Sequence, residues 1–190
     1  MKVFQYGSNC DPKRLNNSSR LNGAATALGK AQTVNNYDLV FDVWSDSNKC
    51  AAANFVASGS ERAWGILYEI SDDRIDRPKG QKGARTLAQI EGKLYEKTSI
   101  EVIHCGQTIS ACTFIVKEEF RTLNIATSAA YVEHITKGLF QFQVPADYIG
   151  HVLDIAIANL VSAGDSSREE LAKVETLRRP APASDKSSRQ

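Results

Sequence analysis

The sequence has little of what several common kinds of site require. Among its 190 residues there are only four cysteines and three histidines. No two cysteines form a C-x-x-C pair and the histidines are widely spaced, so a tetrahedral zinc site is not expected. No apolar run approaches the roughly 20 residues that span a bilayer, so no membrane association is expected either.

The sequence also lacks an excess of charge of either sign. It has 23 Lys and Arg against 22 Asp and Glu, a net charge of +1, which gives no broad field to attract nucleic acid. Its start, MKVFQYGSNC, turns polar at Tyr6 and lacks the apolar region of a secretory signal. We therefore expect a cytoplasmic protein with reduced cysteines, whose partner is a small molecule. Monomer and homodimer both remain open.

Length and composition indicate one domain followed by a tail. A globular domain usually occupies about 100–200 residues, and residues 1–163 alternate apolar runs with turn signals. Residues 164–190 contain no aromatic side chain and few large aliphatic ones. We predict a domain over 1–163 and a partly disordered C-terminal tail over 164–190. Within the tail Leu171, Val174 and Leu177 recur at helical spacing, and disorder is expected beyond Arg179.

Short runs rich in β-branched and aromatic residues predict strands in the first two-thirds of the chain. These runs are Lys2–Gln5, Tyr37–Val43, Asn54–Ala57, Ala63–Ile70, Ser99–His104 and Thr108–Val116. The last two are separated only by Cys105, Gly106 and Gln107, a glycine-containing connection that predicts a hairpin. An antiparallel sheet is the simplest use of these strands.

Helices are expected mainly later in the chain. Thr127 or Ser128 can cap a helix for which Gly138 supplies a left-handed stop, and Pro145 suits the first turn of a second helix. Ser71 can begin a shorter one. Because strands come first and helices flank them, the predicted fold class is α+β rather than alternating βαβ units.

Residues 4–9 read Phe-Gln-Tyr-Gly-Ser-Asn, an apolar strand that breaks abruptly into Gly-Ser-Asn. Successive backbone N–H groups at such a break can form an anion-binding nest for a carboxylate or an oxyanion. Gly-Ser-Asn is also an ordinary turn, and the residues alone leave both readings open. The candidate binding residues here are Phe4, Gln5, Tyr6, Gly7, Ser8 and Asn9.

The Tyr-Gly-Ser-Asn stretch after an N-terminal strand resembles the signature of the γ-glutamylcyclotransferase family. Further segments resemble that family in order over about residues 1–160. They are the basic Asp11–Leu15, Trp64-Gly65 with Tyr68, Glu91-Gly92 with Tyr95, Ser128–Gly138 with Tyr131, and Pro145–Tyr148.

This resemblance implies an α+β fold, a small mixed or antiparallel β-barrel with flanking helices, and a pocket at the YGSN loop. It implies a transferase or lyase-type enzyme that cyclises a small γ-glutamyl substrate to 5-oxoproline and releases an amine or amino acid, as in glutathione metabolism. It implies no metal and no organic cofactor. The leaving group is not specified.

Glu91 is the candidate acid/base. The substrate amine must lose a proton before it attacks and the leaving amine must gain one, so one carboxylate can serve both steps. We expect the apolar neighbours Ile90 and Leu94 to raise the pKa of Glu91. A second alignment with the family places Lys79 where the acid belongs. Lys79 lies in a basic stretch without signs of desolvation, so Glu91 is preferred.

Several aromatic and thiol side chains near these motifs also need an interpretation. Tyr95 either donates a hydrogen bond at the site or anchors a strand, and Tyr131 either contacts substrate or belongs to the core. Cys10 is interpreted as a small buried hydrophobe, and Trp44 and Trp64 as packing residues. A non-catalytic small-ligand-binding module on the same fold remains the alternative function, because of the Lys79 alignment.

Overall fold

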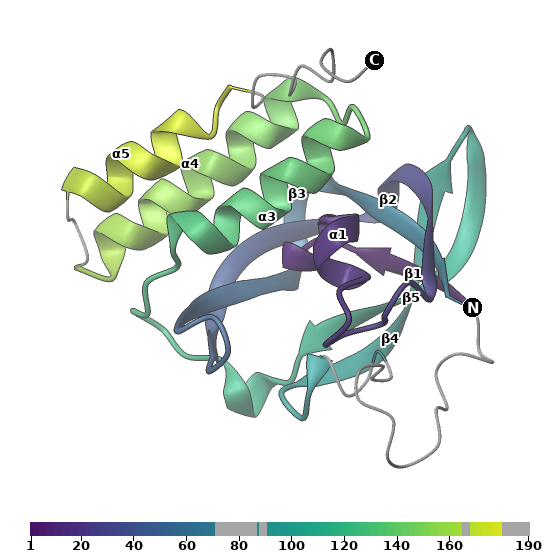
Figure 1. Cartoon of the computed structure of the whole chain (residues 1–190), viewed down its shortest axis with the longest axis horizontal. Helices are drawn as coiled ribbons and strands as arrows, with labels where there is room; N and C mark the ends of the chain where they lie inside the picture. The colour runs from purple at the N-terminus through teal and green to yellow at the C-terminus, as the bar shows by residue number, and fades with distance from the viewer. Residues whose placement is uncertain (71–86, 88–90, 165–167, 180–190) are drawn as a thin grey trace, which may run out of the picture.

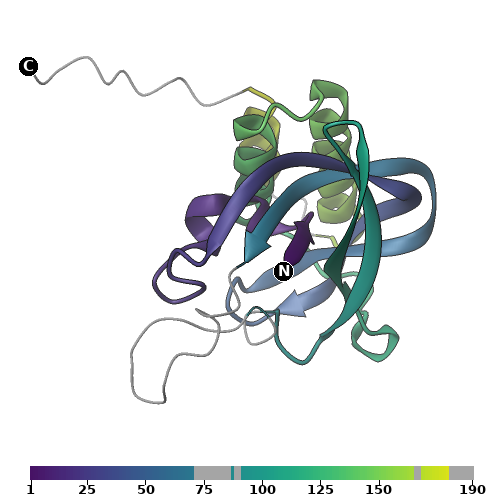
Figure 2. The same cartoon turned by 90° about the vertical axis from the view of Figure 1, so that its right-hand side faces the viewer.

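In a computed structural model, residues 1–70, 87, 91–164 and 168–179 can be described. The strands form a barrel in the order β1-β3-β2-β4-β5 (Figures 1 and 2). Their bounds are β1 Lys2–Gln5, β2 Ala25–Ser45, β3 Cys50–Ile70, β4 Tyr95–His104 and β5 Gln107–Val116. Neighbours in this order pair antiparallel. The barrel closes where β1 meets β5 in parallel through a single pair, Val3 with Cys112, so the predicted fold class is confirmed.

The longest strands differ from the prediction. Residues 54–57 and 63–70 belong to one strand, β3, and β2 begins at Ala25 rather than Tyr37. Residues 25–36 are rich in Ala, Gly and Asn, which have low strand propensity, but they pair with β3 on one side and, at Gln32 and Thr33, with β4 on the other. The tertiary pairing therefore decides their conformation.

The hairpin of β4 and β5 is confirmed. Its register runs without a shift from Tyr95 opposite Val116 to His104 opposite Gln107. The turn residues Cys105 and Gly106 both have positive φ, 49° and 76°, as a two-residue type I′ turn requires.

Three helices form a layer on one side of the barrel (Figure 1). They are α3 (Ala129–Gln141), α4 (Ala146–Ser162) and α5 (Arg168–Thr176). Short turns complete the chain: η1 Ser8–Cys10, α1 Pro12–Leu15 and η3 Glu118–Phe120. No helix in the described ranges is long and apolar enough to cross a membrane. The expected helix at Ser71 and the expected disorder beyond Arg179 fall on residues outside those ranges.

Helix α3 begins as predicted but ends later. The Ser128 hydroxyl accepts a hydrogen bond from the Tyr131 amide at 3.2 Å, which confirms the N-cap. Gly138 is not the stop, because the helix continues to Gln141. A Cβ at Gly138 would collide with the carbonyl group of Cys10, so this glycine allows α3 to pack directly against η1.

The C-terminal helix is anchored to the rest of the fold. Val174 is fully buried and belongs to the same apolar cluster as Phe4 and Ile66 of the barrel and Ile135 of α3. Its spacing in the sequence predicted the helix, and this burial explains how a segment with few large apolar side chains is held.

Candidate active site

Strand β1 leads directly into the loop that the sequence singled out. Gly7 precedes η1 with an extended backbone, and the Cys10 amide donates to the Gly7 carbonyl at 2.9 Å. The Ser8 and Asn9 side chains are buried, so the loop is part of the packed interior rather than an open turn. Tyr131 of helix α3 packs against this loop, since a Cβ on Gly7 would lie 3.3 Å from the Tyr131 hydroxyl oxygen.

Two hollows lie against this loop and share part of their lining. The first, here called the inner cavity, measures about 30 Å³. The second, the outer cleft, measures about 260 Å³. Both are lined by Ser8, Asn9, Glu91, Tyr95 and Tyr131, so the predicted acid borders both hollows. The inner cavity adds Gln5, Tyr6, Gly7, Ala53 and Phe114.

The Glu91 carboxylate is held by the loop. Its Oε1 accepts from the Asn9 amide at 2.8 Å and from the Gln5 amide at 3.4 Å. The Asn9 oxygen in turn accepts from the Arg20 guanidinium at 2.9 Å. Arginine can only donate, so the NH₂ group of Asn9 must face Glu91. Both bonds end on Oε1, and among the described residues no hydrogen bond to Oε2 is seen, so Oε2 is the oxygen that can face a ligand.

Burial raises the pKa of Glu91 above its ordinary value, as the sequence predicted. The positive charge of Arg20 and the hydrogen bonds from Asn9 and Gln5 oppose this rise but do not cancel it. The balance keeps the group able to release and take up a proton closer to neutral pH than an exposed glutamate, which is what a proton shuttle needs.

The raised pKa predicts how Glu91 affects stability. The folded state binds the proton more tightly than the unfolded chain, so the contribution of Glu91 is most favourable below the ordinary pKa and is lost as pH rises through the raised pKa. The variant Glu91→Gln cannot ionise and avoids this loss. Unfolding midpoints measured from about pH 4 to about pH 8 should show the variant gaining stability over wild type as pH rises. A difference that is constant or falls with pH would contradict the shift.

Three tyrosines surround the inner cavity. The Tyr6 ring stacks on Phe55 with centroids 3.6 Å apart, and its hydroxyl donates to the Phe114 carbonyl at 2.6 Å. The Tyr131 hydroxyl oxygen accepts from the Ala53 amide at 3.0 Å, and the Tyr95 hydroxyl donates to the Ala53 carbonyl at 3.2 Å. Burial raises the pKa of all three, so their hydroxyls stay protonated.

Most of the predicted site residues meet here, and one does not. Phe4 is fully buried in the core beneath Gly65 and lines neither hollow. Cys10 is also fully buried, and burial raises the pKa of its thiol, so its interpretation as a small hydrophobe is confirmed. The alternative acid position, Lys79, lies outside the described residues.

The outer cleft contains residues that the sequence did not single out. Much of its wall is formed by Arg20, by the end of β2 at Trp44 and Ser45, and by the turn that follows as far as Asn48. Trp44 is 42% exposed, so the prediction that it serves for packing is wrong. Its indole N–H donates to Asp46 at 3.1 Å, which fixes the ring at the edge of the cleft. Trp44 reaches the cleft only because the fold brings this part of the chain next to the loop at residues 7–9. No local sequence pattern indicates that contact.

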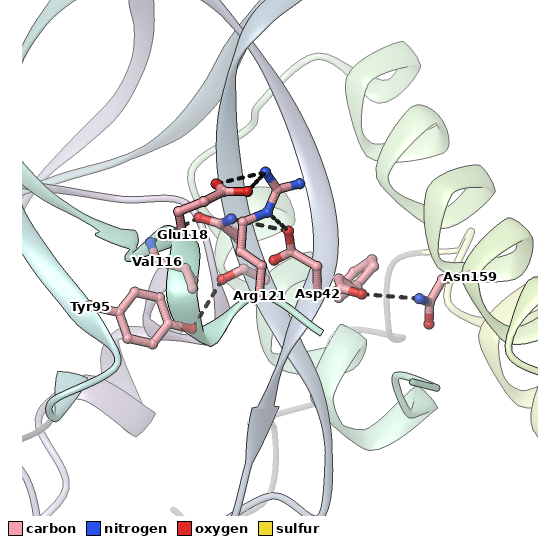
Figure 3. Close-up of polar contacts among 9 residues, drawn as sticks. Asp42, Tyr95, Val116, Glu118, Arg121 and Asn159 are labelled. Carbon is pink, nitrogen blue, oxygen red and sulfur yellow. Dashed lines mark hydrogen bonds and ion pairs between the residues drawn. The ribbon is translucent and has the colours of Figure 1, made fainter. Parts of the chain in front are cut away.

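A buried charge supports the strand that carries Ala53. Asp42 lies at a register shift between β2 and β3, and its Oδ2 accepts from Arg121 at 2.6 Å and from Asn54 at 3.3 Å (Figure 3). The Asn54 oxygen accepts from the Val116 amide of β5 at 3.0 Å. The network thus ties three strands together beside Tyr95.

The variant Arg121→Met is expected to destabilise the protein by about 1.5–3 kcal/mol, because it leaves the buried Asp42 carboxylate without its charged donor. Methionine keeps most of the aliphatic length. The matched control is Arg178→Met, whose partners Asp154 and Glu175 are exposed and whose loss should cost under about 1 kcal/mol. Urea unfolding of both variants measures the difference, and equal losses would show that the Asp42 pair contributes no more than a surface pair.

The comparisons with known proteins concern the family and the fold. The family described as "Gamma-glutamyl cyclotransferase, AIG2-like" matches residues 3–133. No curated protein matches the chain. A solved structure named "Gamma-glutamyl cyclotransferase" has a TM-score of 0.64 at 17% identity, covering 80% of this chain and 85% of its own.

Two further solved structures have similar folds. The human uncharacterized protein loc79017 has a TM-score of 0.66 at 18% identity, covering 80% of this chain and 85% of its own. YkqA from Bacillus subtilis has a TM-score of 0.63 at 19% identity, covering 82% of this chain and 54% of its own. At these identities the neighbours show the shared fold.

The family match covers more than half of the chain. The protein therefore belongs to the AIG2-like γ-glutamyl cyclotransferase family.

Proposed function

We propose that this protein cyclises a γ-glutamyl substrate to 5-oxoproline and releases an amine or amino acid, with Glu91 as the general acid/base. The observation that carries the proposal is the position of Glu91, which borders both the inner cavity and the outer cleft, with one carboxylate oxygen held by the loop. The family membership supports the same reaction.

In the proposed reaction the α-amino group of the substrate attacks its own γ-carbonyl carbon. A C–N bond forms to give a five-membered ring, the carbonyl oxygen becomes an oxyanion, and the C–N bond to the leaving amine then breaks. The α-ammonium group loses two protons in the course of the reaction and the leaving amine gains two. Glu91 can carry them one at a time, because its raised pKa favours both uptake and release.

The two hollows suit the two ends of such a substrate. The inner cavity is small and takes only the reacting groups beside Glu91, while the outer cleft has room for the leaving group. Since the nucleophile belongs to the substrate, the main task of the protein is to hold it in the folded conformation that cyclises. We place the protein in a reducing compartment, the cytoplasm, consistent with four cysteines that are all free.

The proposal is tested by incubating the protein with γ-glutamyl amino acids, γ-glutamyl amines and glutathione, and measuring 5-oxoproline and the released amine. Equal amounts of the two products from at least one compound are expected. Binding of a compound by calorimetry with no product formed would instead favour a non-catalytic small-ligand-binding module.

A further inference from the structure

One residue of β3, Ala53, gives two hydroxyls of the site opposite hydrogen-bonding roles. The Ala53 N–H donates to the Tyr131 oxygen at 3.0 Å, while the Ala53 carbonyl accepts from the Tyr95 hydroxyl at 3.2 Å. A tyrosine hydroxyl has one hydrogen to donate and can also accept. The Tyr95 hydroxyl therefore donates its hydrogen to the Ala53 carbonyl. The Tyr131 hydroxyl instead accepts from the Ala53 N–H through a lone pair of its oxygen.

These bonds determine which hydrogen-bonding group each hydroxyl can still offer to a ligand. Burial raises the pKa of Tyr131, so its hydroxyl stays protonated while its oxygen accepts from the Ala53 amide. Tyr131 can then offer its hydrogen to a ligand. Tyr95 can offer only a lone pair. Both hydroxyl groups belong to residues that line the inner cavity together with Glu91.

Neighbouring residues fix the directions of the Ala53 N–H and carbonyl groups. Ala53 is paired with Phe41 in the β2–β3 ladder, and its neighbour Asn54 is fixed by Asp42 and by the Val116 amide. Because the backbone on both sides of Ala53 is held in this way, its N–H and its carbonyl keep their directions. The roles of Tyr95 and Tyr131 are thus set before any substrate enters.

The cyclisation needs one group of each kind. A donor must stabilise the oxyanion that forms on the γ-carbonyl, and an acceptor must orient the N–H groups of the attacking amine. We propose that the Tyr131 hydroxyl donates to the developing oxyanion and that the Tyr95 hydroxyl accepts from the substrate α-amino group. This inference rests on the proposed function and assigns a catalytic role to both tyrosines.

The test compares Tyr131→Phe and Tyr95→Phe with the matched control Tyr68→Phe. Tyr68 is fully buried and donates to the Cys10 carbonyl at 2.9 Å, but it lines neither hollow. Each of the three variants loses one hydroxyl that is hydrogen-bonded to the backbone, so their thermal unfolding midpoints should fall by similar amounts. Steady-state constants are calculated per folded protein.

The two site variants should differ in which constant changes. Tyr131→Phe is expected to lower kcat about 100-fold with little change in KM, because the donor acts only on the transition state. Tyr95→Phe is expected to raise KM about tenfold, the loss of one hydrogen bond to a charged group. Tyr68→Phe should leave both within about threefold of wild type.

A ligand-binding measurement separates this role from a structural one. The probe is the five-membered cyclic phosphonamidate in which phosphorus replaces the carbonyl carbon of 5-oxoproline, since its tetrahedral centre carries the oxyanion. Its affinity should fall in Tyr131→Phe by about the factor lost in kcat, while the affinity for 5-oxoproline changes little.

The possible outcomes are distinct. If wild type forms 5-oxoproline but Tyr131→Phe keeps its kcat or binds the phosphonamidate as tightly, the assignment of the tyrosines is wrong and the proposed function stands. If wild type forms no 5-oxoproline from any γ-glutamyl compound, the proposed function fails and the assignment fails with it.

Discussion

Replacing Glu91 by glutamine is expected to lower kcat by about 10²–10⁴-fold, the usual contribution of a general acid/base. Glutamine has nearly the same size, and its carbonyl oxygen can still accept from Asn9 as Oε1 does now at 2.8 Å. The variant therefore keeps the geometry of the loop and loses only the ability to carry a proton. Steady-state release of 5-oxoproline measures the effect.

The matched control is Glu96→Gln. Glu96 is exposed on β4, five positions along the chain, and lines neither hollow. It should keep the activity of wild type. An acid/base role for Glu91 would be ruled out if its glutamine variant turned over substrate as fast as this control.

Replacing Gly138 by alanine is expected to destabilise the protein by about 3 kcal/mol and to reduce its activity. In most helix interiors this change stabilises by about 0.5–1 kcal/mol, because glycine loses more conformational freedom on folding. Here the new Cβ would collide with the Cys10 carbonyl, which is backbone and cannot rotate away. Overpacking costs about 1–3 kcal/mol and occasionally more, so the collision outweighs the gain.

Helix α4 offers the matched control, Gly150→Ala. Its Cβ would meet only the end of the flexible Arg178 side chain, at 3.8 Å. This variant should therefore be more stable than wild type by about 0.5–1 kcal/mol. Urea unfolding of both variants measures whether each substitution lowers or raises the free energy of unfolding. A stabilised Gly138→Ala protein would show that α3 and η1 are not packed as closely as described.

The loss of activity in Gly138→Ala follows from the position of η1. Separating α3 from η1 moves Ser8 and Asn9, and Asn9 is the main hydrogen-bond donor to Glu91. The expected result is a rise in KM and a fall in kcat together. The comparison with Gly150→Ala distinguishes this local effect from a general change in stability.

Local sequence patterns predicted the elements whose contacts are close along the chain. The β4–β5 hairpin depends on its two turn residues and on the apolar runs that flank them, all within about twenty positions. The Ser128 cap depends on an amide three residues later. In both, the interacting groups are neighbours in the sequence, so the pattern is sufficient.

Contacts between distant segments could not be predicted in this way. The first half of β2 has a composition typical of a loop and becomes a strand because β3 and β4 pair with it. Gly138 looked like a helix stop because nothing near it in the sequence indicates the Cys10 carbonyl. Trp44 and Arg20 also reach the outer cleft through the packing of distant segments, which no local pattern indicates.

The candidate site shows both situations. Burial of Glu91 was expected from its apolar neighbours in the sequence, and the resemblance to a family placed it beside the loop. The bond between Asn9 and Glu91 joins residues 82 positions apart, and the roles of Tyr95 and Tyr131 depend on the backbone of Ala53, more than 40 positions away from each. Only the folded chain reveals these relations.

The central claim is that Glu91 carries the proton for an intramolecular attack that yields 5-oxoproline. It is tested most directly by incubating wild type and Glu91→Gln with the γ-glutamyl compound that wild type turns over fastest, and following 5-oxoproline and glutamate. We predict 5-oxoproline and the free amine in equal amounts from wild type, and about 10²–10⁴-fold slower release from the variant. Equal rates in the two proteins, or free glutamate as the product, would contradict the account.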